Sequence, residues 1–364
     1  MTVVYKPIDT SYGMISDDLI SRVLSEYGFD SSWIILPLTN VNGCIIAFNR
    51  RSETAKKVIF LLKGRVYILK EIPWYCSSQE FVEFELSFQT YLLRKNLPMP
   101  RIIPTKNNTL WVKEMNRYYY LQEYIEGNAW KKSFTGAEKI GSILAELHTA
   151  SSKWKSAPTG LACENILQPA RNMLSVLRKF ISNNKANLSD DMSFLLVKYI
   201  NMCSKKLAKV HISAGDESYN SLLLYVHGDF NPWNIIFDSN ADVAGITDFD
   251  NACFDNPVHD IAECLVDYCF MQYRPYSTRF EKVPHEFDQD LAFHIIKGYR
   301  EINEKMFQST IKFLPSAVTS IFIELCTLGL LRGDFDHSES VHLLSSLDIL
   351  EESIYNLICH LKHI

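Results

Sequence analysis

The chain has 364 residues, of which 47% are hydrophobic and 12% are aromatic, and its formal net charge at pH 7 is −5. This composition is typical of a globular protein and excludes a largely disordered chain. The length exceeds what one small hydrophobic core supports and favours two subdomains that share an interface. Because no block of Lys and Arg residues occurs, nucleic acid is not expected as a partner.

The N-terminal segment lacks the apolar core of a signal peptide. The longest apolar stretch, 316–331, contains Glu324 and is too short to span a bilayer, so it predicts a buried helix and no membrane partner. The nine cysteines include no C-x-x-C pair. Such an unpatterned set favours reduced thiols and a cytoplasmic location.

The first third of the chain carries mostly strand patterns. A helix is expected over 16–28, where apolar residues recur at helical spacing and a glycine ends the pattern. A second helix is expected over 79–95, before a segment with two prolines. A tight turn at 63–64 predicts a hairpin. The strand-like runs are 33–38, 44–49, 57–62, 65–72, 109–114 and 117–125.

The pattern turns helical after Gly127, with helices expected over 134–153, 168–183 and 189–210. A short strand-loop-strand-strand unit spans 226–249, and helices resume at 258 with a polar, proline-containing break at 274–285. We therefore predict an α+β fold of two lobes. The N-terminal lobe, 1–125, is an antiparallel sheet with one inserted helix, and the C-terminal lobe, 126–364, is mostly helical.

The segment 226-VHGDFNPWNIIFD-238 places polar residues between two apolar runs. Asp229 and Asn234 lie five residues apart in a predicted loop, so their side chains can converge, and Asp248 ends an apolar run fourteen residues later. A catalytic aspartate with an Asn and an Asp as oxygen ligands for Mg²⁺ is the set that phosphoryl transfer needs. The alternative is that these residues cap turns between strands.

Phosphoryl transfer also needs a cation for the phosphates of the nucleotide. Lys70 lies on a predicted strand, where its stem can pack while its ammonium group reaches a phosphate, although an ordinary strand lysine looks the same. Its carboxylate partner belongs on the next helix, which carries Glu80, Glu83 and Glu85. Glu83 and Glu85 cannot both point inward.

A similar string, 332-RGDFDHSE-339, occurs about a hundred residues after the first. Asp334 has no asparagine five residues later, because position 339 is Glu. We interpret this second string as the polar end of a helix without a catalytic role.

Seven segments in this order resemble the aminoglycoside phosphotransferase and choline kinase superfamily, whose members are small-molecule relatives of protein kinases. They cover most of 16–270: 66-VYILK-70, 85-ELSFQTYLLRKNLPMP-100, 120-YLQEYIEG-127, 141-GSILAELH-148, 227-HGDFNPWNIIFD-238, 246-ITDFDNA-252 and 257-PVHDIAE-263. The resemblance implies an ATP- and Mg²⁺-dependent kinase that acts on the hydroxyl group of a small molecule.

The resemblance also assigns roles at the nucleotide site. It selects Glu85 as the partner of Lys70, because the family's glutamate lies thirteen residues before the first proline of an L-P-x-P element. The backbone of Glu123 and Ile125 would bind adenine. The loop 39-TNVNG-43 has a single glycine, unlike protein kinases, and the backbone of Asn42 and Gly43 would offer N–H groups to phosphate.

In the catalytic region the resemblance makes Asp229 the catalytic aspartate, with Asn234 and Asp248 as metal ligands. It gives His227 and Asp260 a structural role in supporting the loop. Asp250 stands where protein kinases have a glycine. It would contact metal or substrate, or cap a turn, and the residues do not decide between these roles.

The sequence does not choose among four classes of acceptor, namely an aminoglycoside, an amino alcohol, a homoserine-like compound and a sugar. The N-terminal segment resembles the homoserine-kinase-like and spore-coat-protein-like branch. A cationic acceptor would need an acidic or aromatic pocket, for which the candidates are Asp255, Glu263, Asp267, Tyr268 and Tyr273. Two other hypotheses remain. One is a catalytically idle binding or spore-coat-type protein, and the other is a metallohydrolase built from His227, Asp229, Asp248, Asp250 and His259.

Overall fold

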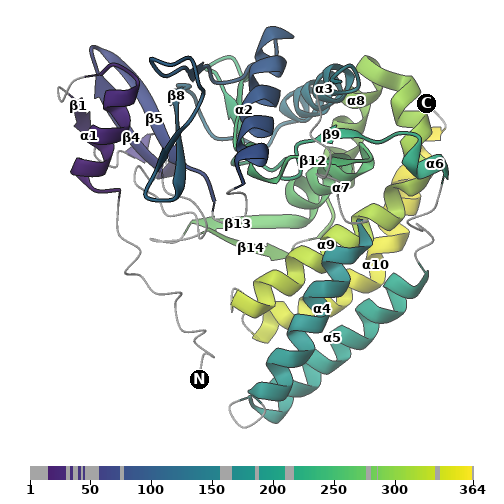
Figure 1. Cartoon of the computed structure of the whole chain (residues 1–364). Helices are drawn as coiled ribbons and strands as arrows, with labels where there is room; N and C mark the ends of the chain where they lie inside the picture. The colour runs from purple at the N-terminus through teal and green to yellow at the C-terminus, as the bar shows by residue number, and fades with distance from the viewer. Residues whose placement is uncertain are drawn as a thin grey trace.

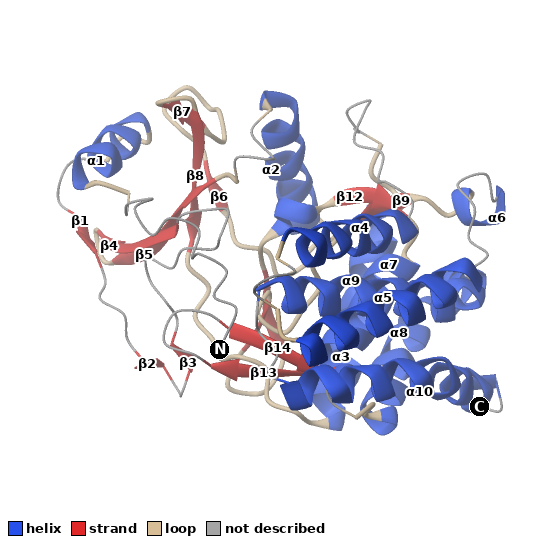
Figure 2. Cartoon of the chain, turned by 90° about the horizontal axis from the view of Figure 1, so that it is seen from below, coloured by secondary structure: helices blue, strands red, loops and turns tan. Residues whose placement is uncertain are grey.

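The computed structural model describes residues 15–29, 33–35, 40–41, 44–45, 57–73, 78–155, 166–184, 188–209, 217–275, 280–284, 286–332 and 337–362. An antiparallel sheet gathers at one end of the molecule, and most helices pack together at the other (Figures 1 and 2). The predicted α+β architecture is confirmed. The boundary at residue 125 stays a prediction, although β8 ends at Glu123 and the next long helix begins at Phe134.

The N-terminal sheet has the strand order β1-β4-β5-β8-β6, with β7 also paired to β8. Its strands are β1 (Trp33–Ile35), β4 (Lys57–Leu62), β5 (Arg65–Glu71), β6 (Ile102–Ile103), β7 (Val112–Glu114) and β8 (Arg117–Glu123). The predicted hairpin turn is present, and both of its residues, Lys63 and Gly64, have positive φ angles, as two-residue hairpin loops favour. A separate short pair consists of β2 (Asn40–Val41) and β3 (Cys44–Ile45).

Two helices accompany the sheet. Helix α1 (Asp17–Glu26) begins at Ser16, whose hydroxyl accepts a hydrogen bond from the backbone N–H of Leu19. Helix α2 (Gln79–Arg94) is capped in the same way by Ser78. Its buried aromatic rings contact the C-terminal lobe, since the Phe84 ring centroid lies 4.7 Å from that of Tyr225 and the Phe88 centroid 5.9 Å from that of Phe249. Helix α2 therefore joins the two lobes.

The C-terminal lobe is built mainly from long helices. The long ones are α3 (Phe134–Ser151), α4 (Leu167–Asn183), α5 (Asp190–Lys209), α8 (Gln289–Thr310), α9 (Leu314–Arg332) and α10 (His337–Lys362), and the short ones are α6 (Glu217–Asn220) and α7 (Val258–Leu265). Helices α3 and α8 cross closely at two glycines. A Cβ atom on Gly141 would lie 1.8 Å from the carbonyl oxygen of Ile295, and one on Gly298 would lie 2.0 Å from that of Glu138.

Two short antiparallel pairs support the predicted catalytic loop: β9 (Leu224–Val226) with β12 (Cys253–Asp255), and β10 (Ile235–Phe237) with β11 (Val243–Ile246). The predicted break in the helical pattern at 274–285 is confirmed for the described residues, but the strands within it were not predicted. There the chain forms a hairpin of β13 (Met271–Pro275) and β14 (Phe280–Pro284). The strands were not predicted because prolines at their ends and polar residues between them are more typical of a loop.

The stretch 289–331, which includes α8 and α9, is long and apolar enough to cross a membrane by length and composition alone. Most of its apolar window is buried inside the fold, as the sequence predicted for 316–331. The second GDF string lies partly outside the described residues, and α10 begins at its His337.

Candidate active site

The loop between β9 and β10 is anchored by the buried carboxylate of Asp260 on α7. One of its oxygens accepts hydrogen bonds from the backbone N–H of His227 (2.8 Å) and from Nε2 of His148 (3.0 Å), and the other accepts the N–H of Gly228 (2.8 Å). Burial opposes the charge of Asp260, yet the bond from His148 and the nearby histidines keep its pKa below the ordinary value. The contacts suit the supporting role predicted for Asp260.

Gly228 permits the turn that precedes Asp229. Its φ angle is +72°, and a Cβ atom there would lie 2.2 Å from the carbonyl oxygen of Asn251. A glycine is required at this position on both grounds.

His227 uses both nitrogens of its ring within the loop. Nδ1 accepts the backbone N–H of Asp229 (3.2 Å), and Nε2 donates to the carbonyl oxygen of Thr247 (3.0 Å). These partners define the neutral tautomer with the proton on Nε2. The ring therefore connects the loop to the end of β11 and has no nitrogen left for a substrate, which suits bracing rather than base chemistry.

Asp229 and Asn234 converge as their spacing predicted. The Nδ2 group of Asn234 donates to the backbone oxygen of Asp229 (2.8 Å) and to its Oδ2 (3.0 Å), while Nδ2 of Asn231 donates to Oδ1 (2.6 Å). The amide group of Asn234 is thereby oriented with its nitrogen toward Asp229. Its oxygen accepts no hydrogen bond within the described part of the chain.

Asp248 follows β11 and has φ 71° and ψ 63°, a left-handed conformation that is uncommon for a non-glycine residue and frequent at functional sites. Its Oδ1 lies 2.5 Å from Nζ of Lys70 and its Oδ2 lies 2.8 Å from Nζ of Lys57. Burial opposes the charge of Asp248, but the two lysines hold its pKa well below the ordinary value. Asp248 therefore stays ionised.

Lys70 also pairs with Asp250, and its side chain is only 2% exposed. The predicted ion pair with Glu85 does not occur among the contacts of these described residues. Glu85 is fully buried and accepts a hydrogen bond from Gln89 (3.0 Å). Burial, and then the charge of Asp250, raises the pKa of Glu85 to about 8, and Asp250 occupies the place beside Lys70 that the resemblance gave to Glu85.

The other nucleotide-site predictions remain open. The backbone N–H of Glu123 donates to the carbonyl oxygen of Arg101 (2.9 Å), so only its own carbonyl group would remain for adenine. Ile125 lies against Gly245. Asn42 and Gly43 lie outside the described residues.

Asn234 and Asp248 provide an amide oxygen and a carboxylate, which are hard oxygen ligands of the kind that Mg²⁺ prefers. The donor set therefore fits the metal that the sequence predicted. A metallohydrolase fits less well. His227 has both nitrogens in use, and Nδ1 of His259 binds Asp255 at 2.8 Å. Within the described ranges, no group of three or more His, Cys, Asp or Glu side chains is placed to hold a metal ion.

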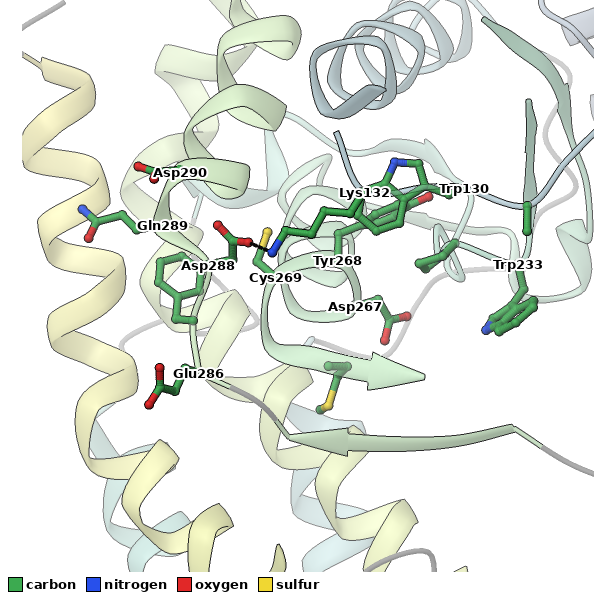
Figure 3. A pocket seen from close by; sticks show the side chains of 14 residues that line it. Trp130, Lys132, Trp233, Asp267, Tyr268, Cys269, Glu286, Asp288, Gln289 and Asp290 are labelled. Atoms are coloured by element: carbon green, nitrogen blue, oxygen red, sulfur yellow. Dashed lines mark ion pairs between the residues drawn. The ribbon is translucent and has the colours of Figure 1, made fainter. Parts of the chain in front are cut away.

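A pocket of about 810 Å³ borders the catalytic loop through Pro232 and Trp233 (Figure 3). Its other walls come from the segment 129–132, from the π-helical turn Val266–Phe270 with Met271, and from the residues at the start of α8. Its polar and aromatic lining residues are Trp130, Lys132, Trp233, Asp267, Tyr268, Glu286, Phe287, Asp288, Gln289 and Asp290.

Of the predicted acceptor-site candidates, the structure places Asp267 and Tyr268 in this pocket. Asp255 binds Tyr219 and His259 instead. The carboxylate of Glu263 accepts the backbone N–H of Phe230 (2.9 Å). Burial, followed by the charge of Asp229, raises the pKa of Glu263 well above its ordinary value. The side chain of Tyr273 lies outside the described residues.

Sequence reasoning missed three contributors to this region. Lys57 looked like any lysine at the start of a strand. His148 lay within a segment that carried the family resemblance, yet its bond to Asp260 joins residues 112 positions apart. Trp130 lies in a segment without a strong secondary-structure pattern. Only Lys57 had an available signal, because its position opposite Lys70 follows from the predicted hairpin register.

Comparisons with known proteins agree with this geometry. A model of the APH family, described as a phosphotransferase enzyme family, matches residues 50–284. The homoserine kinase of Caulobacter vibrioides (strain NA1000 / CB15N) is 27% identical over 233 residues, which cover 63% of this chain and 67% of that kinase.

Two solved structures confirm the kinase-like fold. An aminoglycoside phosphotransferase from Alicyclobacillus acidocaldarius subsp. acidocaldarius DSM 446 has a TM-score of 0.63 at 14% identity, with 94% of this chain and 96% of that chain covered. A microcompartment-associated aminopropanol kinase has a TM-score of 0.59 at 15% identity, with coverage of 96% and 98%.

Proposed function

Because this chain belongs to the APH phosphotransferase enzyme family, we propose that its acceptor is a small alcohol carrying a positively charged amine. The activity class is that of the family, namely ATP-dependent transfer of a phosphoryl group to a hydroxyl group of a small molecule. The pocket beside the catalytic loop is the observation that carries the choice of acceptor.

The charge of the pocket favours a cation. Its lining contains four carboxylate residues and a single lysine, Lys132, which pairs with Asp288. Asp267 is 1% exposed and, in Figure 3, lies between Tyr268 and Trp233. An interaction between a ligand and this buried carboxyl group would be less screened by solvent than one at the surface. An ammonium group is therefore attracted to this wall.

The aromatic residues suit the same ligand. The rings of Trp130 and Tyr268 meet edge to face with centroids 4.8 Å apart, and Trp233 lies across the pocket. Aromatic faces bind ammonium groups through their quadrupoles. The indole N–H of Trp130 and the hydroxyl of Tyr268 are buried without a hydrogen-bond partner among the described residues. The aromatic rings of this wall therefore suit an ammonium-bearing acceptor.

The matched relatives support this chemistry, since homoserine, which their name specifies, carries both a hydroxyl and an ammonium group. In the reaction, Asp229 orients the acceptor hydroxyl and takes its proton while Lys70 binds the phosphates. We also propose that Asn234 and Asp248 hold Mg²⁺, which supplies charge neutralisation when bound. A cytoplasmic setting is proposed because six described cysteines are free thiols.

The test is an ADP-release assay on matched acceptor pairs that differ only in the amine, such as an amino alcohol and its diol counterpart. We expect kcat/KM to be at least tenfold higher for the charged member of each pair, and Asp267→Asn to reduce this preference without changing the KM for ATP. Glu146→Gln, on the exposed face of α3, is the control. A preference for neutral sugars would contradict the proposal. ATP binding without turnover of any acceptor would favour the idle binding protein.

A further inference from the structure

Lys57 is the first residue of β4 and lies directly opposite Lys70 on β5 in the antiparallel register. Directly opposed residues project their side chains from the same face of a sheet. Both ammonium groups reach the same carboxylate, because Lys57 lies 2.8 Å from Oδ2 of Asp248 and Lys70 lies 2.5 Å from Oδ1. The phosphate site therefore contains two lysines, of which the sequence motif accounts for one.

The two lysines differ in their other contacts. Lys70 is 2% exposed and keeps a second carboxylate partner in Asp250. Lys57 is 32% exposed, and Asp248 is its sole ion-pair partner among the residues that the structure describes. A metal ion bound to Asp248 would repel both ammonium groups. Lys70 would remain paired with Asp250, whereas Lys57 would lose its counter-charge.

We propose that Lys57 is a second phosphate-binding residue, which neutralises Asp248 in the ligand-free protein and turns to the nucleotide phosphates when metal takes Asp248. A cation left without a partner in a partly buried site is unfavourable, and the phosphates are the anions that arrive with the metal. The partial exposure of Lys57 and its flexible four-carbon stem allow this change of partner. The inference rests on the ATP-dependent activity and not on the identity of the acceptor.

Calorimetric binding of ATP, ADP and adenosine to the full chain tests the proposal, with each nucleotide measured with and without Mg²⁺. Lys57→Met should weaken Mg²⁺-dependent binding of ATP roughly tenfold. This loss is at the lower end of the range for a hydrogen bond to a charged group, because the site is partly exposed. ADP should lose less affinity, and adenosine none. Without Mg²⁺ the loss for ATP should be smaller, since Lys57 then remains on Asp248.

Lys63→Met is the matched control, because Lys63 lies in the turn at the far end of the same hairpin and is exposed. Lys57→Arg should retain most of the ATP affinity. Equal losses for ATP and adenosine would identify a structural role and overturn the proposal, as would unchanged ATP affinity in Lys57→Met. Failure of the acceptor assay would leave these binding results unaffected, so the two proposals fail separately.

Discussion

Of the side chains that support the catalytic loop, Asp260 is the one whose replacement should affect the loop most. It accepts the backbone N–H groups of His227 and Gly228 and the imidazole Nε2 of His148, and it is fully buried. Asp260→Asn keeps the size of the side chain but replaces one acceptor oxygen with an NH₂ group. In one orientation the NH₂ group faces the backbone N–H of Gly228, and in the other it faces that of His227. Two donors then meet, and no hydrogen bond forms between them.

The expected cost follows from the number of bonds lost. At least one charge-assisted hydrogen bond disappears, which costs about 1.5–3 kcal/mol, and the buried donor left without a partner adds roughly 1–3 kcal/mol. Asp260→Asn should therefore lower the free energy of unfolding by roughly 3–5 kcal/mol. At roughly 2 °C per kcal/mol for a chain longer than 150 residues, Tm should fall by about 6–10 °C.

Function should change along with stability. Since Asp260 fixes the backbone immediately before Asp229, we expect kcat to fall while the affinity for ATP is retained. Thermal and urea unfolding measure the loss of stability, and steady-state kinetics below the melting range measure kcat. Asp17→Asn, an exposed carboxylate on α1, is the control. If Asp260→Asn melted and turned over like wild type, the anchoring role would be refuted.

Three further predictions use different parts of the molecule. Asp229→Ala should bind ATP with unchanged affinity and lose about 10²–10⁴-fold in kcat, and retained turnover would remove its catalytic assignment. Burial raises the pKa of Glu85 to about 8 from an ordinary 4.5, so the folded protein keeps a proton that the unfolded chain loses. This group should make the free energy of unfolding decline by roughly 1–4 kcal/mol between about pH 4.5 and 8, and urea melts of Glu85→Gln should show a decline smaller by that amount. Gly298→Ala would place a Cβ atom 2.0 Å from the carbonyl oxygen of Glu138 and should destabilise the protein by roughly 1–3 kcal/mol, whereas an unchanged Tm would show that α3 and α8 can separate.

The elements that the sequence predicted well are those governed by local chemistry. The β4–β5 hairpin follows from two strand patterns and a turn residue pair, and α2 follows from a helical pattern that ends before two prolines. Asp229 and Asn234 converge because five residues of loop suffice to bring one side chain back to the other. Such features need no knowledge of distant parts of the chain.

The partners of Lys70 could not be predicted in this way. The family resemblance selected Glu85, but Asp250 competes for the same ammonium group, and the outcome depends on burial and on the charges nearby. Neither quantity is visible in a sequence, because each arises when β5, α2 and the residues after β11 come together. The β13–β14 hairpin was missed for a similar reason, since strand pairing was needed to distinguish it from a polar break.

The catalytic loop shows why its motif is informative while its central string is not. Two residues between β9 and β10 have partners outside the loop: His227 and Gly228 bind Asp260 through their backbone N–H groups, and the ring of His227 binds Thr247. These partners come from α7 and from the end of β11, so the loop requires the whole C-terminal arrangement. A second G-D-F string lacks the Asn five residues after its aspartate. Chemistry therefore depends on the spacing and on these distant acceptors, and a search for G-D-F alone would select both strings equally.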